Sequence, residues 1–146
     1  DDAAEIGRML RDWSATPGWP PPGVEDQYRA AFQYGNTAHC ALEYHRWAMR
    51  SIPRADGRRL IRDVSAAAIS APVLHLHGSA DRTVLPRTSL GSRQFTAGPY
   101  AWRLLADVGH FPHEEAPCRV GELILGWLAA GGTWSDPPDA DPLRRW

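Results

Sequence analysis

The fold is decided by a stretch that reads Pro72-Val73-Leu74-His75-Leu76-His77-Gly78-Ser79-Ala80-Asp81. Its first half is a short run of β-prone residues, and its second half is a cluster of residues that favour turns. We therefore expect a strand over residues 73–77, followed by a loop that carries Asp81.

The same order of elements repeats downstream. Residues 86–95 are consistent with a short helix, and residues 100–105 predict a second strand, which leads into the loop Asp107-Val108-Gly109-His110-Phe111-Pro112. A final amphipathic helix follows and ends at Gly131-Gly132; one of its faces comprises Val120, Leu123, Ile124, Trp127 and Leu128. The order strand, helix, strand, helix indicates a parallel α/β unit with a right-handed crossover. Because two parallel strands alone leave an edge exposed, the pattern implies further strands outside this sequence.

Asp81 and His110 are the candidate catalytic residues, because each directly follows one of the two predicted strands. In open α/β sheets the reactive groups gather at the carboxyl ends of the strands, so the two side chains should emerge side by side. A carboxylate beside an imidazole holds the ring in one tautomer and stabilises the imidazolium that forms during proton transfer. Taken singly, an aspartate in a turn or a histidine in a loop more often has no catalytic role.

The sequence around these two residues resembles the C-terminal part of the α/β-hydrolase family. Residues 72–86 are similar to that family's strand, glycine, acid and downstream Val-x-Pro, and residues 108–117 are similar to its Gly-His loop, with an acid and a proline opening the last helix. The order of acid before histidine also matches. This resemblance covers roughly residues 70–130. It implies that Asp81 is the catalytic acid, that His110 is the catalytic histidine, and that no cofactor is needed.

The upstream residues take the place where many of these hydrolases insert a cap. Helical spacing of apolar residues predicts helices over residues 1–14, 24–32, 37–51 and 57–64, the last with Asp56 as its N-cap. Residues 131–146 are polar and rich in proline. The expected organisation is a helical cap over residues 1–66, the C-terminal part of a hydrolase core over residues 67–130, and a tail over residues 131–146.

One predicted cap helix resembles the cap of epoxide-hydrolase-like members, in which a tyrosine polarises the epoxide oxygen. The stretch reads Ala41-Leu42-Glu43-Tyr44-His45-Arg46-Trp47, and the position of that tyrosine falls on His45, with Tyr44 one place before it. The resemblance implies that His45, Tyr44 and Trp47 contact a small apolar or aromatic substrate. The alternatives are a hydrogen-bonded core histidine at position 45 and a packing role for both aromatic residues.

The chain contains no nucleophile elbow of the type Gly-x-Ser-x-Gly or Gly-x-Asp-x-Gly. A serine elsewhere would form an acyl-enzyme after losing its proton to His110, whereas an aspartate would attack an epoxide carbon directly. A metal site is the rival chemical hypothesis, with five possible ligands in His75, His77, Asp81, His110 and His113. No second metal motif such as His-Glu-x-x-His accompanies them.

Composition narrows the classes of partner. A formal net charge of -1 argues against nucleic acid, and no apolar run approaches the roughly 20 residues that cross a bilayer. Cys40 and Cys118 lack paired spacing, which favours reduced thiols and the cytoplasm. Because a helical pattern begins at once after Asp1 with no initiator methionine, we expect a fragment or a processed product. The alternative to a hydrolase fragment is a truncated or split chain that is inactive without an N-terminal half.

Overall fold

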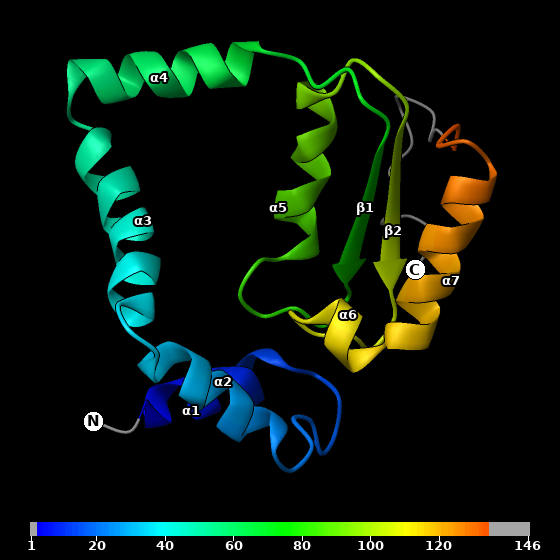
Figure 1. Cartoon of the computed structure of the whole chain (residues 1–146). Coiled ribbons are helices and arrows are strands. Elements are labelled where there is room, and N and C mark those ends of the chain that lie inside the picture. Colours follow the sequence, from blue (N-terminus) through cyan, green and yellow to red (C-terminus); the bar gives the residue numbers. More distant parts are fainter. Residues whose placement is uncertain (1–2, 135–146) are drawn as a thin grey trace. The chain divides into compact units, whose positions relative to one another are not determined.

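The computed structural model describes residues 3–134 (Figure 1). The chain divides into two units: one holds the residues up to Arg11 together with Pro20–Ala67, and the other holds Asp12–Trp19 together with the residues from Ala68 onward. Most of the tail predicted over residues 131–146 lies outside the described residues.

The first unit is helical, as the sequence predicts. Its helices are α1 (Ala4–Trp13, with the last two residues in the second unit), α2 (Val24–Gln33), α3 (Thr37–Ser51) and α4 (Ala55–Ala66). Gly23 precedes α2 with a φ of 86°, a left-handed conformation that glycine adopts without a steric cost. The predicted N-cap of α4 is wrong: Arg54 is the N-cap, and Asp56 lies inside the first turn. There the two carboxylate oxygens of Asp56 accept hydrogen bonds from the Arg54 guanidinium at 3.1 and 3.0 Å. The positive N-terminal end of the helix dipole also stabilises the negative charge of Asp56.

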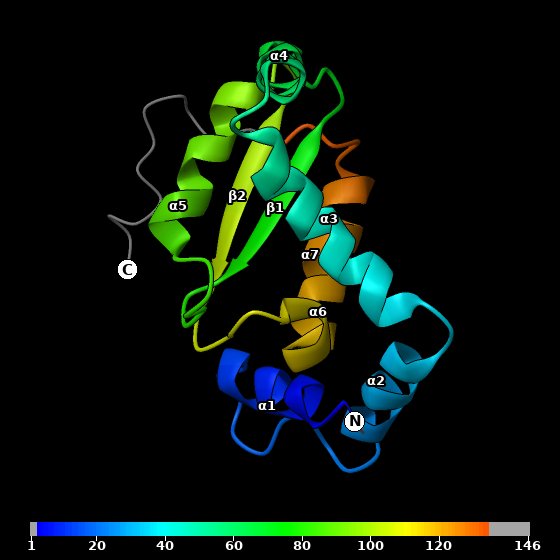
Figure 2. The ribbon, with the colours of Figure 1, turned by 90° about the vertical axis from the view of Figure 1, so that its left-hand side faces the viewer.

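The second unit is built on two parallel strands, β1 (Val73–Gly78) and β2 (Tyr100–Leu105). Figures 1 and 2 both show the two arrows pointing the same way. The Cα register runs from Val73 opposite Tyr100 to Gly78 opposite Leu105. The crossover between them consists of α5 (Pro86–Leu90) and the 3₁₀ helix η1 (Gly91–Phe95), and the helices after β2 are α6 (Pro112–Glu115) and α7 (Pro117–Ala129). The described chain is therefore of the mixed α/β class.

The core of this unit lies around β2. One buried cluster joins Tyr100, Trp102 and Leu104, and a second joins Leu105, Val108 and Val120. The indole N–H of Trp102 donates to the Ser89 hydroxyl at 3.1 Å, so the one polar group of that buried ring is satisfied. By contrast, the first four residues of β1 are only half-buried.

The described sheet has only these two strands, in the order β1–β2. Among the helices of residues 3–134, none has the length and apolar content needed to cross a membrane. Cys40 and Cys118 are both exposed and free.

Candidate active site

Asp81 stands in the loop after β1, which lies directly against the loop after β2. Ser79 N–H donates to Leu105 C=O and Ala80 N–H donates to Val108 C=O, both at 2.9 Å. Gly78 makes this approach possible, because a Cβ at that position would clash with the carbonyl groups of Val108 and Gly109. The sequence therefore needs glycine at the end of β1 to bring the two loops together.

Asp81 and His110 meet at hydrogen-bond distance. The Nδ1 atom of His110 lies 2.9 Å from Oδ2 of Asp81 and 2.7 Å from Oγ1 of Thr83. The other carboxylate oxygen, Oδ1, accepts the N–H and the hydroxyl of Thr83 at 2.8 and 2.7 Å, and the N–H of Val84 at 3.0 Å. Every donor around this carboxylate thus stabilises its charged form.

The electrostatics of Asp81 follow from this geometry. Its side chain is only 5% exposed. Burial raises the pKa of Asp81, but the hydrogen bonds from Val84 N–H, His110 and Thr83 outweigh burial and lower the pKa to about 2. At neutral pH the carboxylate is ionised, so it accepts a hydrogen bond from the Nδ1–H of His110 and leaves Nε2 with its lone pair.

The His110 ring lines a small cavity of about 200 Å³, together with Asp81, His77 and Val84. Its side chain is 30% exposed, against 5% for Asp81. A base at a cavity, oriented by a buried carboxylate behind it, is arranged to take a proton from a group that enters the cavity. The Thr83 hydroxyl is not that group, because it contacts Nδ1 and gives its own hydrogen bond to Asp81.

Glu115 holds the histidine loop in place. Its Oε2 atom accepts the N–H groups of Gly109, Ala15 and Thr16 at 3.0, 3.0 and 3.1 Å, and the Thr16 hydroxyl at 2.9 Å. Its Oε1 atom accepts the N–H of Phe111 at 3.1 Å. Burial raises the pKa of Glu115, but these hydrogen bonds lower it below its ordinary value. This carboxylate therefore joins the loop of His110 to residues 15–16.

At position 115 the sequence predicts only an acid near the start of the last helix. The signal that pointed to it was the acid of the Gly-His loop, which residues 108–117 share with the hydrolase pattern. The five hydrogen bonds show what an acid does there: it satisfies backbone donors of two loops that are far apart in sequence.

Residues 12–19, which the sequence analysis assigned to the cap, pack in the second unit. The N–H of His110 donates to the C=O of Trp13 at 2.9 Å, and the two rings meet edge to face with centroids 5.3 Å apart. Gly109 is again the residue that permits contact, because its Cβ would lie 2.5 Å from the backbone nitrogen of Ala15. Trp19 stacks on Phe111 with centroids 5.1 Å apart. These aromatic rings form one side of the surroundings of His110.

The two histidines of β1 have structural partners. Nε2 of His77 lies 2.9 Å from the C=O of Val84, to which it donates, and 3.7 Å from Oδ2 of Asp81. Nδ1 of His75 lies 3.1 Å from the Tyr100 hydroxyl, and burial, followed by the nearby His77, lowers the pKa of His75. His113 is exposed in α6. Among residues 3–134, no three His, Cys, Asp or Glu side chains gather as a metal-binding group.

The predicted substrate-contacting residues of the cap lie on α3, in the first unit. Tyr44 and Trp47 are 72% and 52% exposed, and His45 is exposed as well. Nδ1 of His45 lies 3.1 Å from the C=O of Ala41 in the same helix. His45 is therefore not a core histidine of its unit, and apolar residues of α3 and its C-cap are exposed as well, among them Leu42, Met49 and Ile52.

Comparison with known proteins does not extend this description: no model of a known protein family matches the chain, and no curated protein matches its sequence.

Proposed function

We propose that this chain supplies the catalytic acid, Asp81, and the catalytic histidine, His110, of a capped α/β-hydrolase that acts on a small ester or epoxide. The observation that carries the proposal is the 2.9 Å contact between a buried, ionised carboxylate and Nδ1 of a histidine at a cavity. That contact prepares Nε2 to act as a base. The nucleophile comes from outside these residues.

The reaction has two steps, and His110 acts in both of them with a serine nucleophile and in the second with an aspartate nucleophile. With a serine nucleophile, Nε2 takes the hydroxyl proton while the oxygen attacks the ester carbonyl, and the alcohol leaves with that proton. Nε2 then takes a proton from water, whose oxygen attacks the acyl-enzyme and releases the acid, and the proton on Nε2 returns to the serine oxygen. With an aspartate nucleophile, the carboxylate attacks an epoxide carbon and the ring C–O bond breaks, while the epoxide oxygen takes up a proton from water or from a cap donor such as Tyr44. His110 then takes a proton from the water that cleaves the resulting ester. In each case Asp81 stabilises the imidazolium, and no cofactor takes part.

We propose further that residues 1–66 largely form a cap, in which Tyr44, His45 and Trp47 contact a small apolar or aromatic substrate, and that the protein is cytoplasmic. The exposure of all three side chains supports a contact role over a packing role. The free thiols of Cys40 and Cys118 support a cytoplasmic setting.

The test is to join the segment to the coding sequence on its 5′ side and to assay hydrolysis of p-nitrophenyl butyrate and styrene oxide. We expect that sequence to encode an elbow with serine or aspartate. His110→Ala should lower kcat at least about a thousandfold, whereas His113→Ala, at an exposed position of α6, should leave it nearly unchanged. An upstream sequence with no elbow, or full activity in the His110→Ala variant, would refute the proposal.

A second candidate is a truncated or split chain that has no activity until an N-terminal half of the same fold joins it. The open edge of β1 favours this candidate, since the described sheet has no strand on that side. Hydrolysis by the 146-residue chain alone, abolished by His110→Ala, would contradict it.

A further inference from the structure

Thr83 follows Asp81 closely in the sequence, and its hydroxyl contacts both Asp81 and His110. The Oγ1 atom of Thr83 lies 2.7 Å from Oδ1 of Asp81 and 2.7 Å from Nδ1 of His110. The same Nδ1 atom lies 2.9 Å from Oδ2 of Asp81. Each of these side chains therefore contacts the other two, so the acid and the histidine share a third partner.

One placement of the protons satisfies all of these contacts. The carboxylate of Asp81 is ionised, and the Thr83 hydroxyl has a single proton to donate. An ionised oxygen binds that proton more strongly than a neutral imidazole nitrogen does, so the hydroxyl donates to Oδ1 of Asp81. Nδ1 of His110 then carries a proton of its own, because a lone pair there would face two oxygen atoms that also present lone pairs.

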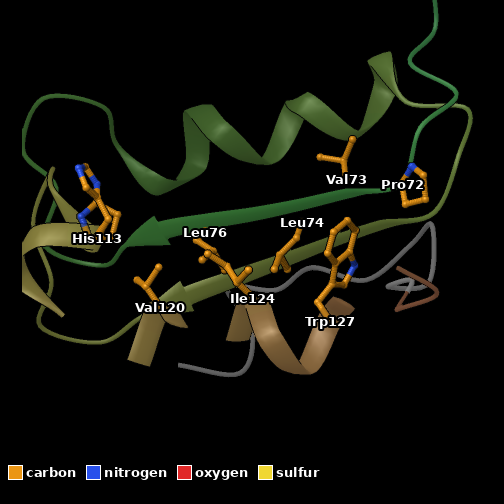
Figure 3. A pocket seen from close by; sticks show the side chains of 9 residues that line it. Pro72, Val73, Leu74, Leu76, His113, Val120, Ile124 and Trp127 are labelled. Carbon is orange, nitrogen blue, oxygen red and sulfur yellow. The ribbon is translucent and has the colours of Figure 1, made fainter. Parts of the chain in front are cut away.

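The loop that carries Thr83 is fixed at the next residue. Val84 N–H donates to Oδ1 of Asp81 at 3.0 Å, and Val84 C=O accepts the Nε2–H of His77 at 2.9 Å. Side chains alternate along a strand. Leu76 points towards α7 (Figure 3), so His77 points to the other face of the sheet, from which it reaches this loop. Because Thr83 N–H also donates to Oδ1 at 2.8 Å, its hydroxyl is held in place beside Nδ1.

We propose that Thr83 is a positioning residue for His110, whose hydroxyl accepts the Nδ1–H as a second acceptor beside Oδ2 of Asp81. This inference rests on the proposed function. A single acceptor lets the ring turn about one hydrogen bond, whereas two acceptors on different side chains fix the direction of Nδ1–H and therefore that of Nε2. When Nε2 takes a proton, the imidazolium keeps both bonds, and the hydroxyl that Asp81 polarises adds to the stabilisation of its charge.

The first measurement uses the purified chain with ¹⁵N in its histidine rings. We expect Nδ1 of His110 to carry the proton and this proton to give a downfield NMR signal. Thr83→Val puts a methyl group where the hydroxyl stands, so the signal should move upfield and its proton should exchange with water about tenfold faster. Thr83→Ser keeps the hydroxyl and should keep both features. His113, an exposed residue at the apolar pocket of Figure 3, is the internal reference whose signals should not change.

The second measurement uses the chain joined to its upstream elbow. Thr83→Val should lower kcat about tenfold and leave KM nearly unchanged, because the hydroxyl bonds Asp81 and His110 and acts through the ring. Thr83→Ser should restore kcat to within about twofold. Thr88→Val removes the hydroxyl of an exposed threonine in α5 and is the matched control, which should change neither constant.

Three results would overturn the inference: a proton on Nε2 and none on Nδ1 in the unaltered chain, an Nδ1–H signal that Thr83→Val leaves unchanged, or a kcat that Thr83→Val lowers no more than Thr88→Val does. The first two are read from the ring of His110 and need no nucleophile. Failure of the hydrolase proposal would appear instead as a missing elbow or an activity that is indifferent to His110→Ala.

Discussion

Glu115 hydrogen-bonds the backbone on both sides of His110, accepting the N–H of Gly109 at 3.0 Å and the N–H of Phe111 at 3.1 Å. The orientation of the imidazole therefore has two sources: Asp81 fixes the ring at Nδ1, and Glu115 fixes the main chain from which the ring projects. Glu115 therefore positions His110 indirectly, through the main chain. The ring of His110 itself hydrogen-bonds Asp81 and Thr83.

Replacing Glu115 with glutamine should loosen the loop. The amide presents N–H groups toward backbone N–H donors, so at least one buried donor loses its acceptor, at a cost of about 1–3 kcal/mol in the free energy of unfolding. Urea denaturation measures this loss. Glu122→Gln changes an exposed acid of α7 in the same way and should cost less than about 0.5 kcal/mol. Equal stability of the two variants would mean that Glu115 does not hold the loop.

Asp81→Asn should invert the tautomer of His110. The asparagine side chain donates as well as accepts, and without the negative charge the proton no longer prefers Nδ1. The ¹⁵N shifts of the ring nitrogens report which one carries the proton. In the chain joined to its elbow, kcat should fall by a factor on the order of 10⁴. Retention of the Nδ1–H tautomer would show that Thr83, rather than Asp81, sets it.

Stability should depend on pH in the acid range. The pKa of Asp81 is lowered from 3.8 to about 2 in the folded chain, so its stabilisation is present above pH 4 and disappears as the pH falls through about 2. The difference corresponds to about 2 kcal/mol, and the lowered pKa of Glu115 acts in the same direction. Denaturation midpoints measured between pH 7 and pH 2 should fall less steeply for Asp81→Asn. Parallel curves for the two proteins would contradict this origin of the acid sensitivity.

Gly78→Ala should separate the loops that carry Asp81 and His110. The new Cβ would clash with the backbone carbonyls of Val108 and Gly109, which cannot rotate away as a side chain can. We expect the free energy of unfolding to fall by about 1–3 kcal/mol or more. Gly121→Ala is the matched control, because nothing lies within 4 Å of its Cβ and alanine favours the helix by roughly 0.5–1 kcal/mol. Thermal unfolding should move in opposite directions for the two variants. A shift in the same direction would disprove the close approach at Gly78.

The strands, the last helix and the meeting of Asp81 with His110 could be predicted because local signals coincide. Turn-forming residues end each β-prone run, and parallel strands bring both ends to one edge. Local signals could not predict the role of Glu115. The hydrogen bond from Ala15 N–H to Glu115 spans 100 residues of sequence, and its donor is a backbone group that almost any residue would supply. The choice between a contacting and a core role for His45 was beyond such signals for a related reason. Helical spacing defines a face, but it does not say whether another element covers that face.

The anchoring of residues 12–19 in the second unit has a consequence for how this chain can vary. Because Trp13 and Ala15 are bonded to the His110 loop, and the residues from Ala68 onward continue into β1, the segment Pro20–Ala67 leaves the second unit and returns to it at two secured points. Insertions between secured ends add only a slowly growing entropic cost. Residues 20–67 can therefore change in sequence, lengthen or be replaced as a block, while the contact between Asp81 and His110 is kept.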